Sequence, residues 1–276
     1  MIIYYKMGKD FTENDIEILI STMNQESLDF LFPMFPLKHF SNYNILIINQ
    51  SKTTTLLSEL PSVRVINTSA VGLSRSRNLA IENAIGKILI IADDDVIYQN
   101  DLIEKIITAY NKFDKATIIN FCAIKEKGVS LKKYPGVSKL QLNAFEIFNI
   151  SSVEMTINKE KLDSTGIRFD ENFGLGSSFE LGEEAVFLFD LKHKKQQIAF
   201  ENQVIVKHEG LTSSDKIDSL HKYYIYGAIL RRISRTNYAF WLMTKLFFDI
   251  KQKKLKISSF FRAIDNANKG RKKLKS

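Results

Sequence analysis

The chain has 276 residues, 45% of them hydrophobic, which is enough to bury a sizeable core. Its single cysteine, Cys122, excludes an internal disulfide framework and a multi-cysteine zinc site, and it fits a reducing cytoplasm. The net charge of +8 is concentrated at the C-terminus, because residues 245–276 hold 11 Lys or Arg against 2 Asp and the remaining 244 residues sum to −1. This distribution argues against a nucleic-acid-binding protein, whose basic residues would extend over the body of the fold.

No targeting or membrane-spanning segment is expected. The N-terminus lacks a basic start followed by a long apolar run, so it does not resemble a secretory signal. The most apolar late stretch, residues 239–250, is too short to cross a bilayer and contains Lys245 and Asp249. We therefore predict a cytoplasmic protein.

Strands and helices alternate through the first half of the chain. Short apolar runs predict strands buried on both faces of a parallel sheet, at residues 17–21, 44–49, 63–67, 87–92 and 116–124. Helices are predicted at 74–84, with Ser74 as the cap, and at 101–113, where Asp101 suits the N-terminus. The alternation predicts βαβ units and an α/β fold with a Rossmann-like, mostly parallel sheet.

The second half is less regular. The pattern weakens over residues 125–149, as expected for a long loop. The later elements are predicted in chain order: a strand at 152–158, a helix ending near 164, a Gly-rich segment at 169–184, a helix at 185–194, one or two strands at 197–207, and amphipathic helices after His208. We predict two domains, an α/β domain over residues 1–210 and a helical, basic extension over residues 211–276.

Three adjacent carboxylates follow the apolar run at 87–92. Asp93, Asp94 and Asp95 repel one another and resist burial without a cation. At the carboxyl end of a parallel strand they would face the crevice where open α/β sheets bind ligands. Carboxylates in that position suit Mg²⁺ or Mn²⁺ bound to phosphate oxygens, whereas the alternative is a solvated acidic turn or a helix cap.

The helix predicted just before this strand carries cationic and amide side chains near its start. Arg75 and Asn78 lie three residues apart and so share a face. A helix N-terminus with nearby arginines can receive a diphosphate. Two arginines on a surface helix are common, so the signal gains its weight from the carboxylates that follow.

Together, the segment GLSRSRNLAIENAIGKILIIADDDV at residues 72–96 resembles inverting glycosyltransferases of the GT-A fold, family 2, of the bacterial surface-polysaccharide type. The resemblance implies that Asp93 and Asp95 hold a Mn²⁺ or Mg²⁺ ion, with Asp93 nearer the ribose and Asp94 between them. It also implies that an arginine of the helix contacts the nucleotide. Arg75 is preferred over Arg77, because it shares a face with Asn78.

The Gly-rich segment FDENFGLGSSFELGEE extends this resemblance, which covers residues 15–210. Family members place an acidic pair here, usually Glu-Asp, whose second member is the catalytic base. The resemblance therefore assigns the base to Glu184, and gives Glu183 a role in orienting the loop or binding sugar hydroxyls. Glutamate is one methylene longer than aspartate, which departs from the family, and glutamates that open a helix also favour its dipole.

Further binding residues follow from the same resemblance. His208 ends the last predicted strand, where some GT-A enzymes have a third metal ligand; a structural role has equal weight. After the second strand, Asn49 and Gln50 replace the aspartates of the family, yet an amide oxygen still accepts a hydrogen bond from uracil. Thr22 and Asn24, after the first strand, complete the predicted nucleotide-sugar site.

These residues predict an inverting glycosyltransferase that uses a nucleotide-sugar donor, with UDP as the expected carrier. The expected acceptor is a saccharide or a lipid-linked saccharide in surface-polysaccharide synthesis. A nucleotidyltransferase or a dehydrogenase would need a Gly-rich loop after the first strand, and residues 21–25 contain no glycine. The alternative is a non-catalytic, membrane-associated protein on a degenerate transferase fold, which the substitutions at positions 49, 50 and 184 favour.

The basic tail suggests a partner of its own. Aromatic and aliphatic residues are interleaved with the Lys and Arg of residues 245–276, as in helices that lie on anionic lipid. The alternative of nearly equal weight is an amphipathic helix packed on the catalytic domain. The sequence thus predicts an enzyme that works in the cytoplasm, at the inner face of a membrane.

Overall fold

The computed structural model describes residues 11–125, 128–208, 217–234 and 236–274. The chain divides into two compact units. The first comprises Met1–Val71, Arg75–Arg168 and Leu191–Gly210, and the second comprises Gly72–Ser74, Phe169–Asp190 and Leu211–Ser276. The Gly-rich segment is therefore grouped with the C-terminal helices, while the domain boundary near residue 210 stays a prediction.

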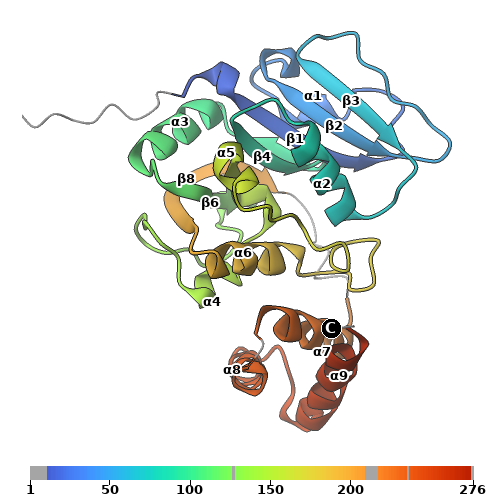
Figure 1. Ribbon diagram of the computed structural model, residues 1–276, viewed down its shortest axis with the longest axis vertical. Coiled ribbons are helices and arrows are strands. Elements are labelled where there is room, and N and C mark those ends of the chain that lie inside the picture. Colours follow the sequence, from blue (N-terminus) through green and yellow to red (C-terminus); the bar gives the residue numbers. More distant parts are fainter. Residues whose placement is uncertain (1–10, 126–127, 209–216, 235, 275–276) are drawn as a thin grey trace, which may run out of the picture. The chain divides into compact units, whose positions relative to one another are not determined.

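The first unit is built on a sheet in the strand order β3-β2-β1-β4-β7-β6-β8-β5 (Figure 1). Its strands are β1 (Ile16–Met23), β2 (Ile45–Gln50), β3 (Val63–Thr68), β4 (Ile88–Asp93), β5 (Val96–Tyr98), β6 (Ala116–Ile124), β7 (Met155–Asn158) and β8 (Gln197–His208). The strand pairs β1–β2, β1–β4, β2–β3 and β6–β8 are parallel. The pairs β4–β7, β6–β7 and β5–β8 are antiparallel. The predicted α/β fold with a mostly parallel sheet is confirmed.

Most predicted strands are found with small shifts at their ends, because continuous apolar runs mark strands that are buried on both faces. Two differences stand out. The strand predicted from residue 152 begins as a 3₁₀ turn at Ser152–Glu154, and only Met155–Asn158 is extended. The short β5 was not predicted, because Val96–Tyr98 is too brief to show a pattern of its own.

One face of the sheet packs on α1 (Leu31–Met34) and α3 (Leu102–Lys112). The buried side of α3 includes Leu102, Ile106 and Tyr110, at the helical spacing seen in the sequence. Asp101 precedes the helix as predicted. In the described structure its side chain makes no capping hydrogen bond, and its carboxylate pairs with the Lys105 ammonium at 2.7 Å.

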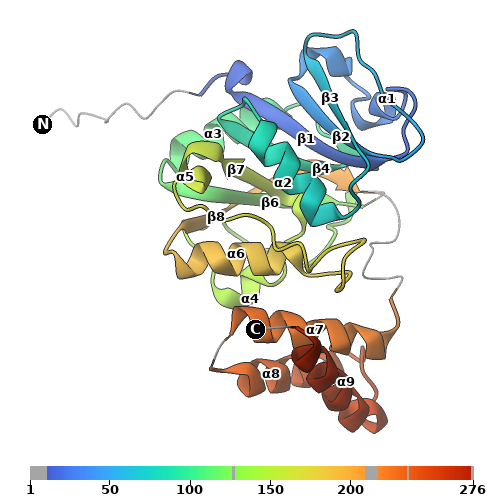
Figure 2. The same cartoon turned by 45° about the vertical axis from the view of Figure 1, so that its right-hand side comes forward.

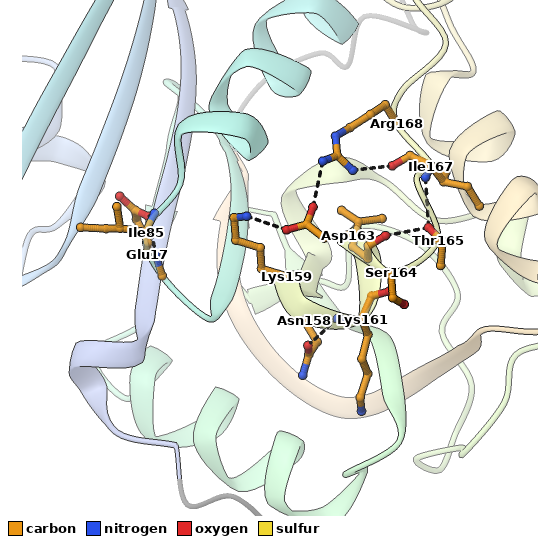
Figure 3. A network of polar contacts seen from close by, with 12 residues as sticks. Glu17, Ile85, Asn158, Lys159, Lys161, Asp163, Ser164, Thr165, Ile167 and Arg168 are labelled. Atoms are coloured by element: carbon orange, nitrogen blue, oxygen red, sulfur yellow. Dashed lines mark hydrogen bonds and ion pairs between the residues drawn. The ribbon is translucent and has the colours of Figure 1, made fainter.

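Buried Glu17 connects the start of β1 to the end of α2 (Leu73–Asn83). Its carboxylate accepts hydrogen bonds from the Arg64 guanidinium at 2.6 Å and from the backbone N–H of Gly86 at 2.8 Å. It also accepts one from the backbone N–H of Ile85 at 2.7 Å (Figure 3). Three donors offset the cost of burying this charge. Gly86 is required here, since a Cβ at this position would lie 2.6 Å from the Cβ of Glu17.

A second polar network fixes the short helix α5 (Lys159–Asp163), where the chain leaves the sheet (Figure 3). Asn158 caps this helix by accepting a hydrogen bond from the Lys161 N–H at 3.1 Å. The Asp163 carboxylate binds the Lys159 ammonium at 2.6 Å and the Arg168 guanidinium at 2.8 Å. Both cations hold the pKa of Asp163 below its usual value against the opposing effect of desolvation. The network therefore fixes the last residues of the first unit before the Gly-rich segment begins.

The second unit contains three C-terminal helices, α7 (Ser219–Ile233), α8 (Tyr238–Lys251) and α9 (Phe260–Lys273) (Figure 2). Helices α7 and α9 cross at two glycines. A Cβ on Gly227 would lie 1.8 Å from the carbonyl oxygen of Ala267, and one on Gly270 would lie 1.7 Å from that of Tyr224. The backbones can approach this closely only without side chains at the crossing.

Replacing Gly227 with alanine is expected to lower the free energy of unfolding of the second unit by about 1–3 kcal/mol, the usual effect of overpacking. Alanine favours a helix more than glycine does, so a loss of stability would have to come from the crossing. Urea unfolding followed by the fluorescence of Trp241, the only tryptophan, reports on this unit. Gly136→Ala is the control, because a Cβ there meets no described atom within 4 Å. Equal midpoints for the two variants would contradict the prediction.

Candidate active site

The carboxyl ends of β1, β2 and β4 bring several predicted site residues to one edge of the sheet. In the parallel register, Ser21 of β1 lies opposite Asp93 of β4, and Thr22 lies opposite Asn49 of β2. Asp93 is the last residue of its strand, and Asp94 and Asp95 form the turn that follows. This edge is where open α/β sheets bind their ligands.

The three carboxylates have three different partners. Asp93 Oδ1 accepts a hydrogen bond from the Arg77 guanidinium at 3.0 Å. Asp94 Oδ2 accepts a short bond from the Thr22 hydroxyl and a long one, 3.5 Å, from the Gln25 amide. Asp95 Oδ1 lies 3.4 Å from Nε2 of His208. Separate partners reduce the mutual repulsion of the triplet and fix the direction of each carboxylate.

Arg77 is buried, and its guanidinium connects two parts of the first unit. Its side chain is 2% exposed, and its guanidinium also donates to the Ser152 hydroxyl at 2.8 Å. It thereby joins the carboxylate of Asp93 to the 3₁₀ turn that opens β7. Arg75 is exposed and Asn78 is buried. Exposure leaves Arg75 able to meet a ligand, so the preference for Arg75 as the nucleotide contact stays a prediction.

Ser74 does not cap α2, contrary to the prediction. The helix begins one residue earlier, at Leu73, and so includes Ser74. The reason is a contact in the second unit, where the buried Ser74 hydroxyl donates to the carbonyl of Phe173 at 2.7 Å. The Leu73 N–H likewise donates to the carbonyl of Leu175 at 2.9 Å. The start of α2 is therefore tied to the Gly-rich segment.

His208 is the last residue of β8 and pairs with Val96, the residue after Asp95. This register explains why the imidazole meets the Asp95 carboxylate. The hydrogen bond to Asp95 raises the pKa of His208 above its ordinary value, although burial opposes the shift. Its Nδ1 is buried and meets no hydrogen-bond partner among the described residues.

The chemistry of these side chains fits a hard divalent cation. Asp95 and His208 lie close enough to share an ion, and the Asp93 carboxylate is one-third exposed. Within the described residues no group of three or more His, Cys, Asp or Glu side chains forms a ready metal cluster. Mg²⁺ does not need one, because it is usually held by one or two carboxylates together with substrate phosphates and water.

The residues predicted to read the nucleotide base are largely engaged within the protein. The fully buried amide of Asn49 donates to the carbonyl of Gln25 and to Asn67 Oδ1, and its oxygen accepts from the Gln25 N–H at 3.1 Å. Gln50 is also buried. Asn24 is exposed, and its φ of 55° places it in the left-handed region that asparagine tolerates. Asn49 therefore holds the loop that presents Asn24 and Gln25; the sequence did not single out Gln25.

The Gly-rich segment belongs to the second unit and forms a compact turn. Phe173 and Phe179 are buried and stack with ring centroids 5.3 Å apart, and the Gly174 N–H donates to the carbonyl of Phe179 at 2.8 Å. Gly174, Gly176 and Gly182 have φ values of 98°, 78° and 94°, which a residue with a side chain rarely adopts. The backbone of the predicted glycine loop therefore requires glycine at these three positions.

The acidic pair opens α6 (Glu183–His193) directly after this turn. The two glutamates differ in environment. Glu183 is 5% exposed and lies under the turn, since a Cβ on Gly174 would come within 3.3 Å of its carboxyl carbon. Glu184 is partly exposed. Adjacent residues on a helix point about 100° apart, which explains why one is buried and the other can meet a ligand.

Helix α7 supports this acidic segment along its length. Its Arg232 donates two hydrogen bonds to the Asp190 carboxylate, at 2.9 and 2.8 Å, and one to Asp170 at 2.8 Å. Ile229 fills the space beside Gly182, where a Cβ would lie 2.2 Å from its Cδ1 atom. Arg232 thus binds both ends of the segment from 170 to 190. Arg232 could not be singled out from the sequence, because its partners lie far away along the chain.

Comparisons with known proteins identify the family and similar folds. Residues 21–163, just over half of the chain, match the model of the family described as glycosyl transferase family 2. The crystal structure of residues 1–349 of S. aureus TarS is similar, with a TM-score of 0.59, 12% identity, and coverage of 92% of this chain and 80% of that one. Two further structures of that fragment are 12% identical over 91% of this chain and 79% of that one: the complex with UDP-GlcNAc, at a TM-score of 0.59, and the complex with UDP, at 0.53. No curated protein matches the sequence.

Proposed function

This chain belongs to glycosyl transferase family 2, and we propose that it moves a sugar from a UDP-linked donor to a saccharide or lipid-linked saccharide acceptor, with inversion at the anomeric carbon. Its α/β sheet and C-terminal helices are GT-A-like. The observation that carries the proposal is the carboxylate triplet at the end of β4, held in three directions by Arg77, Thr22 and His208. The TarS fragment in complex with UDP-GlcNAc and with UDP supports a UDP-linked donor.

In the proposed reaction Glu184 takes the proton of the acceptor hydroxyl, whose oxygen forms a bond to the anomeric carbon as the bond to the diphosphate breaks. Arg75, exposed on α2, would meet the negative charge of the leaving diphosphate. Glu183 would hold the turn in place through its buried carboxylate. This division of roles matches the different exposure of the two glutamates.

We propose that Asp95 and His208, with Asp93 beside them, hold a Mn²⁺ or Mg²⁺ ion. Bound there, such an ion would neutralise the charge that develops on the diphosphate. Arg77 already neutralises part of the charge on Asp93, so Asp95 is the carboxylate most available to an ion. Asp95 Oδ1 and His208 Nε2 lie 3.4 Å apart, which places both side chains within reach of one ion.

We propose that the reaction takes place in the cytoplasm at the inner face of a membrane, where a lipid-linked acceptor would lie. Among the described helices none has the length and apolar character needed to cross a bilayer.

The test is release of UDP from a panel of UDP-sugars, including UDP-GlcNAc, by the purified full-length protein with Mn²⁺. We expect hydrolysis of at least one donor, loss of activity in excess EDTA, and a loss of at least roughly tenfold in Asp95→Asn, because a metal ligand is removed. Asp114→Asn, at an exposed carboxylate in the same unit, is the control. Full activity in EDTA would refute the metal site. Failure to bind or cleave any nucleotide-sugar would instead favour the non-catalytic protein on a degenerate transferase fold.

A further inference from the structure

Helix α8 carries large apolar residues on its exposed side as well as on its buried side. Its inner side is buried and includes Leu242 and Leu246. Phe240, Met243 and Phe247 are spaced three and four residues apart, so they form a stripe on one face, and both phenylalanines of this stripe are 62% exposed. A helix that needed only to pack on its own unit would carry polar residues on this outer face.

A basic loop continues from this stripe. Lys251, the last residue of α8, and Lys253, Lys254 and Lys256 after it are all exposed, whereas Leu255 is buried. The loop is folded back onto the end of α8, because the N–H groups of Lys254 and Leu255 donate to the carbonyl of Asp249 at 2.8 and 3.2 Å. The lysines are therefore presented by an ordered turn, next in sequence to the apolar stripe.

Apolar residues also follow the basic loop. Ile257 is 76% exposed and Phe261, four residues later at the start of α9, is 81% exposed. The basic loop is thus bordered on both sides by large apolar side chains. We call Phe240, Met243, Phe247, Ile257 and Phe261, together with the four lysines, the aromatic–basic surface.

The acidic residues of these helices do not neutralise this surface. Asp249 is buried and bound by the Lys245 ammonium and the Tyr223 hydroxyl, at 2.7 and 2.6 Å. The exposed Asp265 pairs with Lys269 at 2.7 Å. The lysines of the loop are therefore available to an external anion, and their number in so short a segment favours a surface of many negative charges.

We propose that the aromatic–basic surface docks on an anionic lipid bilayer, with the apolar side chains inserted among the headgroups and the lysines on the lipid phosphates. Segments that lie on the surface of an anionic membrane combine exposed apolar side chains with basic residues in this way. A second copy of the chain is a poorer partner, since a symmetric contact through this face would bring the two lysine clusters together. Docking needs no substrate, so it is independent of the proposed sugar transfer.

Flotation of the full-length protein with vesicles tests the proposal. We expect the protein to float with vesicles of phosphatidylcholine and phosphatidylglycerol, and to stay in solution with phosphatidylcholine alone. Phe247→Ser combined with Phe261→Ser should lower the bound fraction at least roughly tenfold, because two aromatic anchors are lost. Replacing Lys253, Lys254 and Lys256 with glutamine should lower the bound fraction at least as much. Because salt screens exposed charges, 0.5 M NaCl should also weaken binding.

The matched control replaces three exposed lysines of the first unit, Lys52, Lys115 and Lys194, with glutamine. It removes the same charge and should float like the unmodified protein. Circular dichroism establishes that each variant is folded. The proposal is overturned if the unmodified protein does not float, if the control loses binding as much as the loop variant, or if neutral vesicles bind equally well. Tight binding of a single-stranded oligonucleotide without flotation would assign the surface to nucleic acid instead.

Discussion

Replacing Glu184 with glutamine is expected to lower sugar transfer by roughly two to four orders of magnitude, the usual effect of losing a general base. Glutamine keeps the shape of the side chain and its hydrogen bonds but cannot take a proton. Binding of donor and metal should be nearly unchanged, because the carboxylates proposed for that role are Asp93 and Asp95. Single-turnover transfer to an acceptor, with donor affinity measured separately by calorimetry, distinguishes the two effects.

The neighbouring glutamates provide the controls. Glu180→Gln alters an exposed carboxylate of the same segment and should transfer normally. Glu183→Gln changes a buried side chain under Gly174, so it is expected to lower stability together with activity. If Glu184→Gln is active and Glu183→Gln is folded but inactive, the base is the first glutamate. If both transfer normally, the base lies outside this pair.

The contacts that anchor the acidic segment do not depend on the carboxylate of Glu184. The segment is held by Arg232 through Asp170 and Asp190, and by the packing of Ile229 on Gly182. Burial raises the pKa of Asp170, but the hydrogen bonds from the Asn172 N–H and from Arg232 outweigh it and hold this pKa below its usual range. None of these contacts involves Glu184, so a loss of transfer without a loss of stability would be a chemical effect.

The sequence predicted the elements of the fold well wherever local pattern decides the structure. Continuous apolar runs located β1 to β4 and β6, and the helical spacing of Leu102, Ile106 and Tyr110 located α3. The position of Asp93 to Asp95 after a buried strand also placed them correctly at the carboxyl edge of the sheet. Each of these features depends on residues that are neighbours along the chain.

The features that sequence could not predict depend on distant partners. Arg77 binds the Asp93 carboxylate and the Ser152 hydroxyl, and only the folded chain brings these three side chains together. Ser74 was expected to cap a helix, but its hydroxyl binds the carbonyl of Phe173, 99 residues away. The grouping of the Gly-rich segment with the C-terminal helices has the same origin in non-local contacts, such as that of Arg232 with Asp170.

The two arginines of α2 should behave oppositely when each is replaced with methionine. Arg77→Met leaves the Asp93 carboxylate and the Ser152 hydroxyl without their buried donor, so it should lower the free energy of unfolding by about 3 kcal/mol, the lower end of the range for a broken buried pair. The lower end applies because Asp93 is one-third exposed. Arg75→Met changes an exposed side chain and should alter stability by less than about 0.5 kcal/mol.

Affinity for UDP in the presence of Mn²⁺ should show the reverse order. If Arg75 contacts the diphosphate, Arg75→Met loses a charge-assisted hydrogen bond of about 1.5–3 kcal/mol, or roughly 10–100-fold in affinity. Arg77→Lys keeps the charge and can still reach one of its two acceptors, so its stability should lie between those of Arg77→Met and the unmodified protein. Urea unfolding followed by circular dichroism, together with calorimetric titration of UDP, measures both quantities. Unchanged UDP affinity in Arg75→Met, with a loss in the folded Arg77→Lys, would transfer the nucleotide contact to Arg77.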